Sequence, residues 1–184
     1  MHVNGILVVS ATKAEAAHVP DRYDVLITGI GKVTAAVAVT AALARHPEDA
    51  RPLVVNIGTA GALHDHHGGL YVPSTVINHD ISSNVLRSLG HPVQDTLAIG
   101  DGDGTVLATG DTFVSEAEVR DALAARADLV DMEGFAIAHA AAYMGAGIRL
   151  VKYVSDHADD TAMDWPKQID AAARALAQWL EERY

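Results

Sequence analysis

Short apolar runs alternate along the chain with longer, Ala-rich stretches. The runs contain many β-branched side chains and are too short for helices, which is typical of strands. Because they lack a clean alternation of apolar and polar positions, we expect both faces of the sheet to be covered. The predicted strands lie at residues 6–9, 25–28, 53–57, 72–77, 105–108 and 148–154.

Two of the Ala-rich stretches predict helices between these strands. A helix at 32–46 would turn one apolar stripe toward the sheet. The members of this stripe are Val33, Ala36, Val37, Thr40 and Leu43. A helix at 132–144 would end at Gly145, because glycine readily adopts the left-handed conformation that follows many helices.

Two further helices are predicted from the residues that begin them. Ser115 followed by Glu118 matches a capping box and predicts a helix at 115–126. The last helix is expected to begin near Pro166, with Asp164 as its N-cap. Its buried stripe would comprise Ile169, Ala173, Leu176 and Leu180. The alternation of strands and helices predicts an α/β sandwich with a mostly parallel sheet.

Length and composition limit the classes of protein to which this chain can belong. The 184 residues fit one domain, and 24 acidic against 13 basic side chains give a net charge of −11. This charge argues against nucleic acid or an anionic membrane as a partner. The chain has no cysteine, which excludes disulfides, thiolate metal sites and thiol nucleophiles. Without a long apolar run or the basic start of a signal peptide, a cytoplasmic protein is expected.

Two polar segments could suggest a metal site. His64, His66 and His67 lack a helical i, i+4 pair and a distant partner motif, so a polar loop explains them as well. The segment GDGDG at 100–104 lacks the remaining ligands of a calcium loop, and we interpret it as a hairpin turn. No metal or organic cofactor is expected.

Two glycine-rich segments follow predicted strands. Residues 28–32 (TGIGK) open a helix, where free backbone N–H groups favour an anion or an oxygen-rich ligand. Because Thr34 stands at the third glycine position, the segment is not a dinucleotide fingerprint, and it lacks the Walker A spacing. Residues 56–61 (NIGTAG) offer similar groups at the end of another strand. Either segment could also be a purely structural turn.

Three acidic residues lie near the ends of predicted strands: Glu15, Glu133 and Asp156. Each could be a helix cap or a first-turn acid, since carboxylates stabilise helix N-termini. Three such residues on one sheet nevertheless favour a shared pocket. Carboxyl groups in different environments can divide the work of an acid and a base.

Together, five segments in this order resemble the purine nucleoside phosphorylase and nucleosidase superfamily, most closely the 5′-methylthioadenosine/S-adenosylhomocysteine nucleosidases. The segments are 29–33 (GIGKV), 56–61 (NIGTAG), 109–114 (TGDTFV), 131–134 (DMEG) and 154–159 (VSDHAD). The resemblance spans almost the whole chain. It implies one nucleoside phosphorylase-like domain over residues 1–184, built as a three-layer sandwich with a mostly parallel or mixed central sheet. It also implies a homodimer.

The resemblance implies a role for each matched residue. Asp156 would be the general acid toward N7 of the purine, and Glu15 would position and deprotonate the attacking water. Glu133 would accept hydrogen bonds from the ribose hydroxyls, with Met132 packed under the sugar. The remaining expected substrate contacts are Phe113 and Val114 at the base, Thr59, Ala60 and Gly61 near the water, and Ser155.

This chemistry suits carboxyl groups. Breaking an N-glycosidic bond builds positive charge on the ribose and negative charge on the leaving base. Phosphorylases must also hold a phosphate dianion, which favours arginine. Here Asn56 and the uncharged residues 10–12 occupy the places where those enzymes carry arginine. Of the nearby cations, Lys13 and Lys32, the second is expected on a helix surface, so water is the favoured nucleophile.

The chain also departs from the family pattern. It is shorter, and the nine residues between Glu15 and Val25 are too few for the usual hairpin. The stretch 80–105 is expected to lack a helix that the family carries. Lys152 and Asp131 stand where the family usually has Arg and Glu.

The sequence therefore predicts a nucleosidase that hydrolyses a purine nucleoside, such as methylthioadenosine or S-adenosylhomocysteine, to base and sugar. Three alternatives stay open. The first is another nucleosidase resembling futalosine hydrolase, and the second is a phosphate-dependent phosphorylase. The third, from another class, is a nucleoside-binding protein without turnover.

Overall fold

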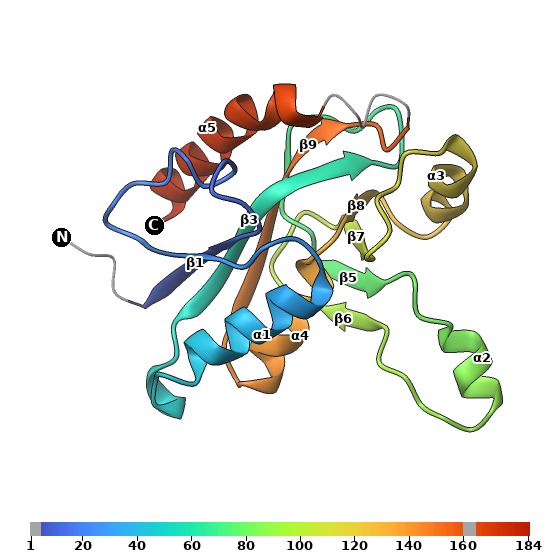
Figure 1. The fold of residues 1–184 in the computed structure, drawn as a ribbon, viewed down its shortest axis with the longest axis horizontal. Coiled ribbons are helices and arrows are strands. Elements are labelled where there is room, and N and C mark those ends of the chain that lie inside the picture. Colours follow the sequence, from blue (N-terminus) through green and yellow to red (C-terminus); the bar gives the residue numbers. More distant parts are fainter. Residues whose placement is uncertain (1–4, 160–164) are drawn as a thin grey trace.

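A computed structural model describes residues 5–159 and 165–184, which form a mixed sheet with helices on both faces (Figure 1). The strands are β1 (Ile6–Ser10), β2 (Asp24–Ile27), β3 (Leu53–Ala62), β4 (Leu70–Tyr71), β5 (Thr75–Asn78), β6 (Thr96–Ala98), β7 (Val106–Thr109), β8 (Leu129–Asp131) and β9 (Ile148–Asp156). The helices are α1 (Lys32–Leu43), α2 (Ser83–Ser88), α3 (Ala117–Ala124), α4 (Gly134–Tyr143) and α5 (Trp165–Arg183), with a 3-10 turn at Glu48–Ala50.

The sheet consists of two parallel groups that meet at the long strand β3. Strands β1, β2, β3 and β9 run parallel to one another, and so do β5, β7 and β8. The groups join where β3 and β8 pair antiparallel, with Gly61 opposite Val130. The short strands β4 and β6 pair antiparallel with β9 and β5. The prediction of a mostly parallel or mixed central sheet is confirmed.

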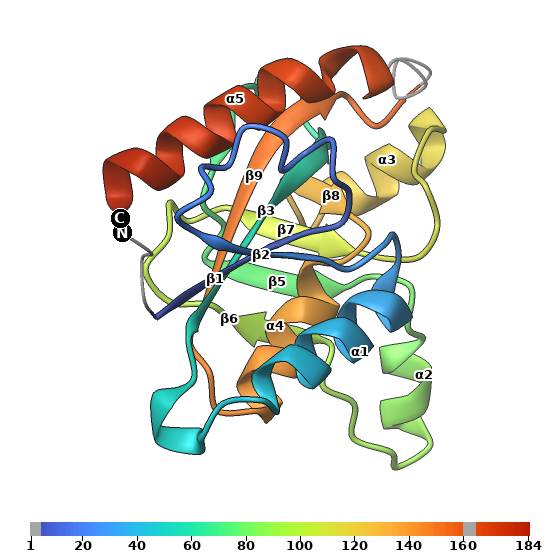
Figure 2. The same cartoon turned by 60° about the vertical axis from the view of Figure 1, so that its left-hand side comes forward.

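Helices cover the two faces of the sheet, as the apolar strands predicted (Figure 2). On one face α5 packs Leu176 and Leu180 against Ile57 and Val151. On the other face α1 and α4 lie side by side, and their many alanines allow the helices close approach to each other and to the sheet. Burial on both faces explains why the strands read as continuous apolar runs.

The predicted strands all correspond to strands of the fold, and three short ones were missed. Strands β4, β6 and β8 have only two or three residues, too few for a periodic pattern. The segment 56–61, predicted to follow a strand as a ligand-binding loop or a turn, lies inside β3, which continues through its glycines to Ala62. The stretch 80–105 does contain a helix, the short α2, so the expectation that it lacks one is wrong.

The helix predictions were right in place and partly wrong in detail. In α1 the sheet-facing residues are Ala35, Val39 and Leu43, whereas Val33 and Val37 are 73% and 65% exposed. An almost uniformly apolar helix offers no contrast from which its buried face can be read.

The expected features at helix starts and turns also need correction. Helix α3 begins after Glu116 and has no side-chain cap, so the capping box at Ser115 is wrong. Asp164, the expected cap of α5, lies outside the described residues. The GDGDG segment connects β6 to β7, which lie on opposite sides of β5, so it is a crossing loop and not a hairpin turn. Asp103 holds this loop by accepting the N–H groups of Val72 and Thr105.

Candidate active site

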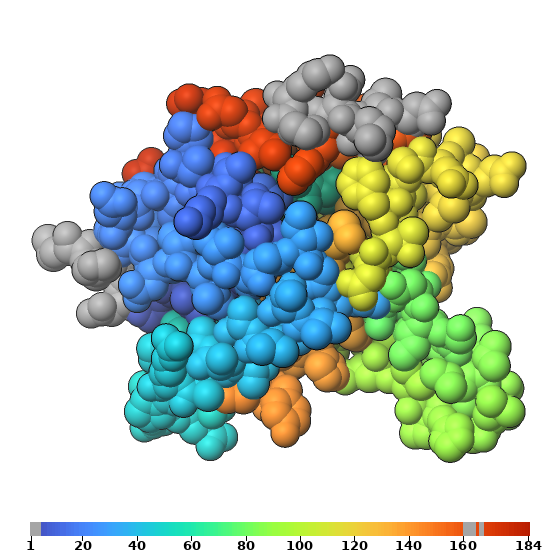
Figure 3. Space-filling model, viewed as in Figure 1, coloured from blue at the N-terminus to red at the C-terminus, as the bar shows by residue number. Residues whose placement is uncertain are grey.

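A pocket of about 210 Å³ opens at the carboxyl-terminal ends of β1, β3, β8 and β9, the edge where open α/β sheets bind ligands. The space-filling view shows a hollow between the blue N-terminal segments and the yellow segment that leads into α3 (Figure 3). All ten predicted site residues line the pocket: Glu15, Thr59, Ala60, Gly61, Phe113, Val114, Met132, Glu133, Ser155 and Asp156. The structure adds Ala11, Thr12, Ile30, Thr112, Val130, Asp131 and Trp165.

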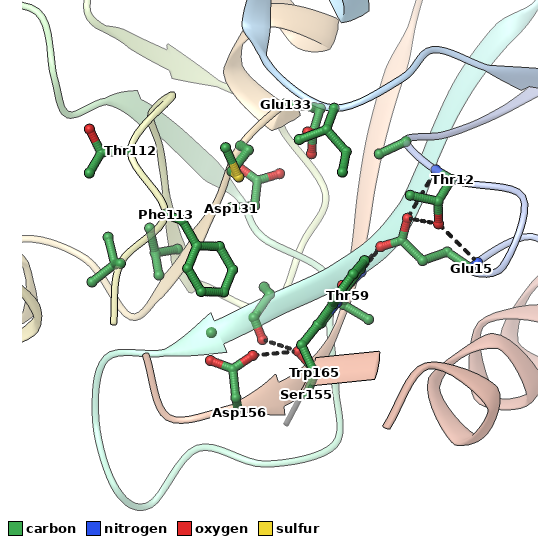
Figure 4. A pocket seen from close by; sticks show the side chains of 17 residues that line it. Thr12, Glu15, Thr59, Thr112, Phe113, Asp131, Glu133, Ser155, Asp156 and Trp165 are labelled. Atoms are coloured by element: carbon green, nitrogen blue, oxygen red, sulfur yellow. Dashed lines mark hydrogen bonds between the residues drawn. The ribbon is translucent and has the colours of Figure 1, made fainter. Parts of the chain in front are cut away.

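Glu15 is buried in the turn after β1 and accepts four hydrogen bonds (Figure 4). The backbone N–H and the hydroxyl of Thr12 donate to Oε2 at 3.1 and 2.8 Å. The same two groups of Thr59 donate to Oε1, both at 2.8 Å. These four donors hold the carboxyl group in place and fix its plane.

A second charged group lies at the start of α4. Asp131 accepts the Gly134 N–H at 2.8 Å and the Thr109 hydroxyl at 2.5 Å, and it forms an ion pair with Lys152 at 2.9 Å. Burial alone would lower the pKa of Lys152. The charge and hydrogen bond of Asp131, together with the charges of Glu133 and Glu15, outweigh burial and raise that pKa above its usual value. Beside this pair, Glu133 accepts the Gly31 N–H at 2.8 Å.

Glu133 is about half protonated at neutral pH in this environment. Burial raises its pKa to about 7, and the negative charge of Asp131 adds to the rise. A carboxyl group in this state can both donate and accept hydrogen bonds. Such a group suits a pair of vicinal hydroxyls on a sugar.

Asp156 ends β9 and is held on both oxygens. The Ser155 hydroxyl donates to Oδ2 at 2.7 Å, and the Ala158 N–H donates to Oδ1 at 2.9 Å. Ala158 has a φ of 52°, in the left-handed region, which is the backbone turn that aims its N–H at the carboxylate. Gly61 makes room for this turn, since an added Cβ would lie 2.9 Å from the Ala158 Cβ.

The loop after β7 carries Phe113, which is half-exposed, and the buried Val114. It is anchored through Asp111, which accepts the backbone N–H of Lys32 at 2.8 Å and donates its own N–H to Asp80 at 2.8 Å. The Lys32 ammonium, which was expected on a helix surface, lies at the start of α1 and also bonds Asp80. These contacts tie the two loops and the start of α1 together beside the pocket.

The pocket has distinct sides. Phe113 and Glu15 lie on opposite sides of the view, with Glu133 on a third side and Asp156 below, toward Phe113 (Figure 4). A planar ring would fit against Phe113 with Asp156 at its edge, leaving Glu15 for a group on the far side of the pocket. Four of the lining residues are carboxylic acids, which suits a reaction that builds positive charge in the middle of the pocket.

Sequence reasoning missed four polar or aromatic lining residues: Thr12, Thr112, Asp131 and Trp165. The Thr12–Glu15 spacing of three residues is the only signal that could have placed Thr12 on the carboxylate. Trp165 belongs to no motif and to no apolar stripe. Its position became visible only when β3 and α5 were brought together.

The histidine-rich loop after β3 forms a surface cluster. The rings of His64, His66 and His67 lie 4.3–5.5 Å apart between centroids, near Asp128. Among the described residues, no group of three or more His, Asp or Glu side chains is arranged to hold a metal ion. In the same part of the chain, no helix is long and apolar enough to cross a membrane.

Comparison with known proteins places this geometry in context. Residues 21–101 and 103–182 match the family model described as the phosphorylase superfamily. The chain is 26% identical over 164 residues to a 5′-methylthioadenosine/S-adenosylhomocysteine nucleosidase of Buchnera aphidicola, covering 74% of this chain and 63% of that protein. The chain thus spans less than two thirds of the length of this relative.

Two solved structures share the fold. A mutant 5′-methylthioadenosine nucleosidase of Helicobacter pylori, with 5′-methylthioadenosine in its active site, has a TM-score of 0.83 and 20% identity, covering 97% of each chain. The futalosine hydrolase of the same organism has a TM-score of 0.82 and 20% identity, covering 97% of this chain and 96% of that one. At this identity the likeness concerns the fold alone.

Proposed function

Because this chain belongs to the phosphorylase superfamily, we propose that it is a nucleosidase that hydrolyses the N-glycosidic bond of a purine nucleoside. The proposed substrate is a 5′-modified adenosine, such as methylthioadenosine or S-adenosylhomocysteine. The observation that carries the proposal is the convergence of Glu15, Glu133 and Asp156 on one pocket, each in a different hydrogen-bonding environment. A protein that only bound nucleosides would need neither an acid nor a base for water.

In the proposed reaction, water adds to C1′ of the ribose while the bond from C1′ to N9 of the purine breaks. Glu15 accepts a proton from the water, and Asp156 gives a proton to N7 of the leaving base. The products are the free purine and the free sugar. Glu133 binds the ribose hydroxyls, and the surrounding carboxyl groups stabilise the oxocarbenium-like transition state.

The contacts of Ser155 support an acid role for Asp156. The Ser155 hydroxyl bonds Asp156 at 2.7 Å and also lies 3.5 Å from the carbonyl oxygen of Ala60. When Asp156 is protonated, the hydroxyl can turn toward Ala60 and accept the carboxylic proton instead. Ser155 can therefore satisfy both protonation states of the proposed acid.

Water fits the nucleophile side of the pocket better than phosphate does. A phosphate dianion next to Glu15 would face a carboxylate at close range, and like charges repel strongly in a buried site. The Lys32 ammonium bonds Asp80 and Asn78, and the Lys152 ammonium bonds Asp131. The two lysines are therefore already engaged by the protein.

We also propose that the protein acts as a homodimer. The outer face of α1 exposes Val33 and Val37. Helix α2 projects away from the sheet at the lower right of Figure 1, and it and the residue that follows it expose Val85 and Leu89. A second copy of the chain would cover this apolar surface. Ile30 both lines the pocket and is more than half exposed at the start of α1, so the partner would also reach the pocket mouth.

The proposal includes the organisation and location that the sequence predicts. Residues 1–184 would act as one domain in the cytoplasm, with no metal or organic cofactor. Cell fractionation tests the location, and turnover after exhaustive dialysis against a chelator tests the cofactor requirement.

Incubation of the purified protein with candidate nucleosides, each with and without phosphate, tests the function. The panel comprises methylthioadenosine, S-adenosylhomocysteine, adenosine, inosine and futalosine, and chromatography follows the free base. Adenine release from methylthioadenosine without phosphate is the expected result. Release only with phosphate would indicate a phosphorylase. Release only from futalosine would indicate a nucleosidase that resembles futalosine hydrolase. Binding without release would leave a nucleoside-binding protein.

A further inference from the structure

Trp165, the first residue of α5, reaches the proposed catalytic site through one hydrogen bond. Its indole N–H donates to the Thr59 hydroxyl oxygen at 2.7 Å, and its side chain lines the pocket (Figure 4). The same hydroxyl oxygen lies 2.8 Å from Oε1 of Glu15. Helix α5 is thus connected to the proposed water-activating carboxylate through a single side chain of β3.

The chemistry of these groups fixes the direction of each hydrogen bond. An indole N–H can only donate, so the Thr59 oxygen accepts, and its single proton is left for Glu15. The other carboxylate oxygen has a matching arrangement. The backbone N–H of Glu15 donates to the Thr12 hydroxyl at 3.2 Å, which leaves the Thr12 proton for Oε2.

We infer that Trp165 is a positioning residue, which fixes the Thr59 hydroxyl as a donor to Glu15 and thereby holds the carboxylate in the orientation that activates water. The inference rests on the proposed function and deepens it. Without the indole N–H, the Thr59 hydroxyl is free to rotate, and Glu15 loses a donor that defines its plane. The position of α5, which carries Trp165, then affects the orientation of Glu15.

A simpler role for Trp165 is that of an aromatic wall against the substrate. The two roles differ in their kinetics. A wall contributes to binding, so its loss raises KM, whereas a positioning residue acts on the reacting arrangement, so its loss lowers kcat. They also differ in dependence on Thr59, because only the positioning role requires the Thr59 hydroxyl.

A double-mutant cycle between Trp165 and Thr59 tests the inference. Trp165→Phe keeps an aromatic ring and removes the N–H, and Thr59→Val keeps the branched shape and removes the hydroxyl. We expect Trp165→Phe to lower kcat about tenfold with KM changed less than about threefold, because the Thr59 hydroxyl that donates to the charged Glu15 is no longer held in place. In the Thr59→Val background, Trp165→Phe should have no further effect on kcat.

The matched control is Trp179→Phe, because Trp179 is the only other tryptophan, lies on the same helix and packs against Tyr184 outside the pocket. It should leave kcat unchanged, and thermal unfolding confirms that each variant is folded. If Trp165→Phe does not fold, Trp165→Leu takes its place, since it also lacks the N–H. Because Trp165→Leu also removes the aromatic ring, KM can rise for either role. The kcat of this variant and its dependence on the Thr59 hydroxyl then distinguish the positioning role from the wall role.

Two results would overturn the inference alone: an unchanged kcat in Trp165→Phe, whether or not KM rises, or additive losses in the double variant. Each of these requires turnover by the unmutated protein. If the unmutated protein releases no base from any nucleoside, the proposed function fails first and this inference falls with it.

Discussion

The three carboxyl groups proposed to act on the substrate occupy three different environments. Glu15 accepts four hydrogen bonds, Glu133 is buried with its pKa raised to about 7, and Asp156 is bonded by a hydroxyl that has a second acceptor within reach. Carboxyl groups in unlike environments can hold different protonation states at one pH. This is the condition for dividing the work of base, sugar binding and acid among three residues of one chemical type.

Asp156→Asn tests the proposed acid. The amide keeps the size of the side chain and can still accept the Ala158 N–H, but it has no acidic proton for N7. We expect methylthioadenosine to bind while kcat falls about 100-fold or more. Calorimetry measures the binding and adenine release measures kcat. Asp121→Asn, a change at an exposed position of α3, is the control. Near-normal turnover of Asp156→Asn would show that Asp156 is not the acid.

Glu133 predicts a pH dependence of stability. Its pKa is raised from 4.5 to about 7, so the folded protein holds a proton that the unfolded chain has released in this interval. Its contribution to the unfolding free energy is therefore present at pH 4.5 and is lost as the pH rises to about 7. The loss amounts to about 3 kcal/mol for a shift of this size.

Urea unfolding of the wild type and of Glu133→Gln at pH 5 and pH 8 measures this effect. The variant should gain stability relative to wild type between the two pH values, because glutamine does not titrate. His79, whose pKa is lowered by burial, titrates in both proteins and cancels in the comparison. Glu118→Gln on the exposed face of α3 should show no such gain, and equal curves for Glu133→Gln and wild type would contradict the assignment.

At the scale of elements, β3 organises the site. It pairs with β1, β8 and β9, and its register with β9 shifts between Ala60 and Gly61. This irregularity lies where Thr59 contacts Glu15 and where Gly61 faces Asp156. One strand therefore sets the distance between the proposed base and the proposed acid.

Gly61→Ala tests this dependence on β3. The added methyl group would lie 2.9 Å from the Ala158 Cβ and 3.1 Å from Oδ1 of Asp156, so the turn that holds Asp156 must move. We expect a loss of about 1–3 kcal/mol in the unfolding free energy and a lower kcat. Gly68→Ala is the control, since its methyl group would meet nothing within 4 Å. Equal stability and turnover in the two variants would contradict the account.

The sequence predicted which residues share a pocket better than it predicted the elements around it. The pocket residues lie at or after the ends of strands, and the motifs of the family resemblance named them without knowledge of the packing. The buried face of α1 could not be read, because Val33 and Val37 are as apolar as the residues that pack on the sheet. Trp165 and Thr59 are 106 residues apart, and nothing local in either segment indicates their contact.

At the scale of the whole molecule, the pocket and the apolar outer face of α1 share a border. Ile30 lines the pocket and is exposed just before α1. An exposed apolar surface next to a pocket mouth is typical of an interface. The proposed homodimer would therefore both cover this surface and limit the access of water to the site.

Val37→Glu tests the proposed dimer, because a buried, unpaired carboxylate would prevent association. Light scattering should give the mass of a dimer for the wild type and of a monomer for the variant. The control is Val119→Glu, which places the same charge on an exposed apolar position of α3. A monomeric wild type, or a dimer that persists with both Val33→Glu and Val37→Glu, would contradict the proposed interface.

The source of the oxygen atom added to the sugar tests the central claim most directly. Methylthioadenosine is incubated with the protein in water enriched in the heavy isotope of oxygen, in the presence of unlabelled phosphate. Mass spectrometry then measures the mass of the sugar product. Unlabelled sugar kept in the same water corrects for exchange. The account predicts free adenine and a sugar that carries one heavy oxygen atom from the start of turnover. A sugar phosphate without heavy oxygen would contradict hydrolysis and show that phosphate is the nucleophile.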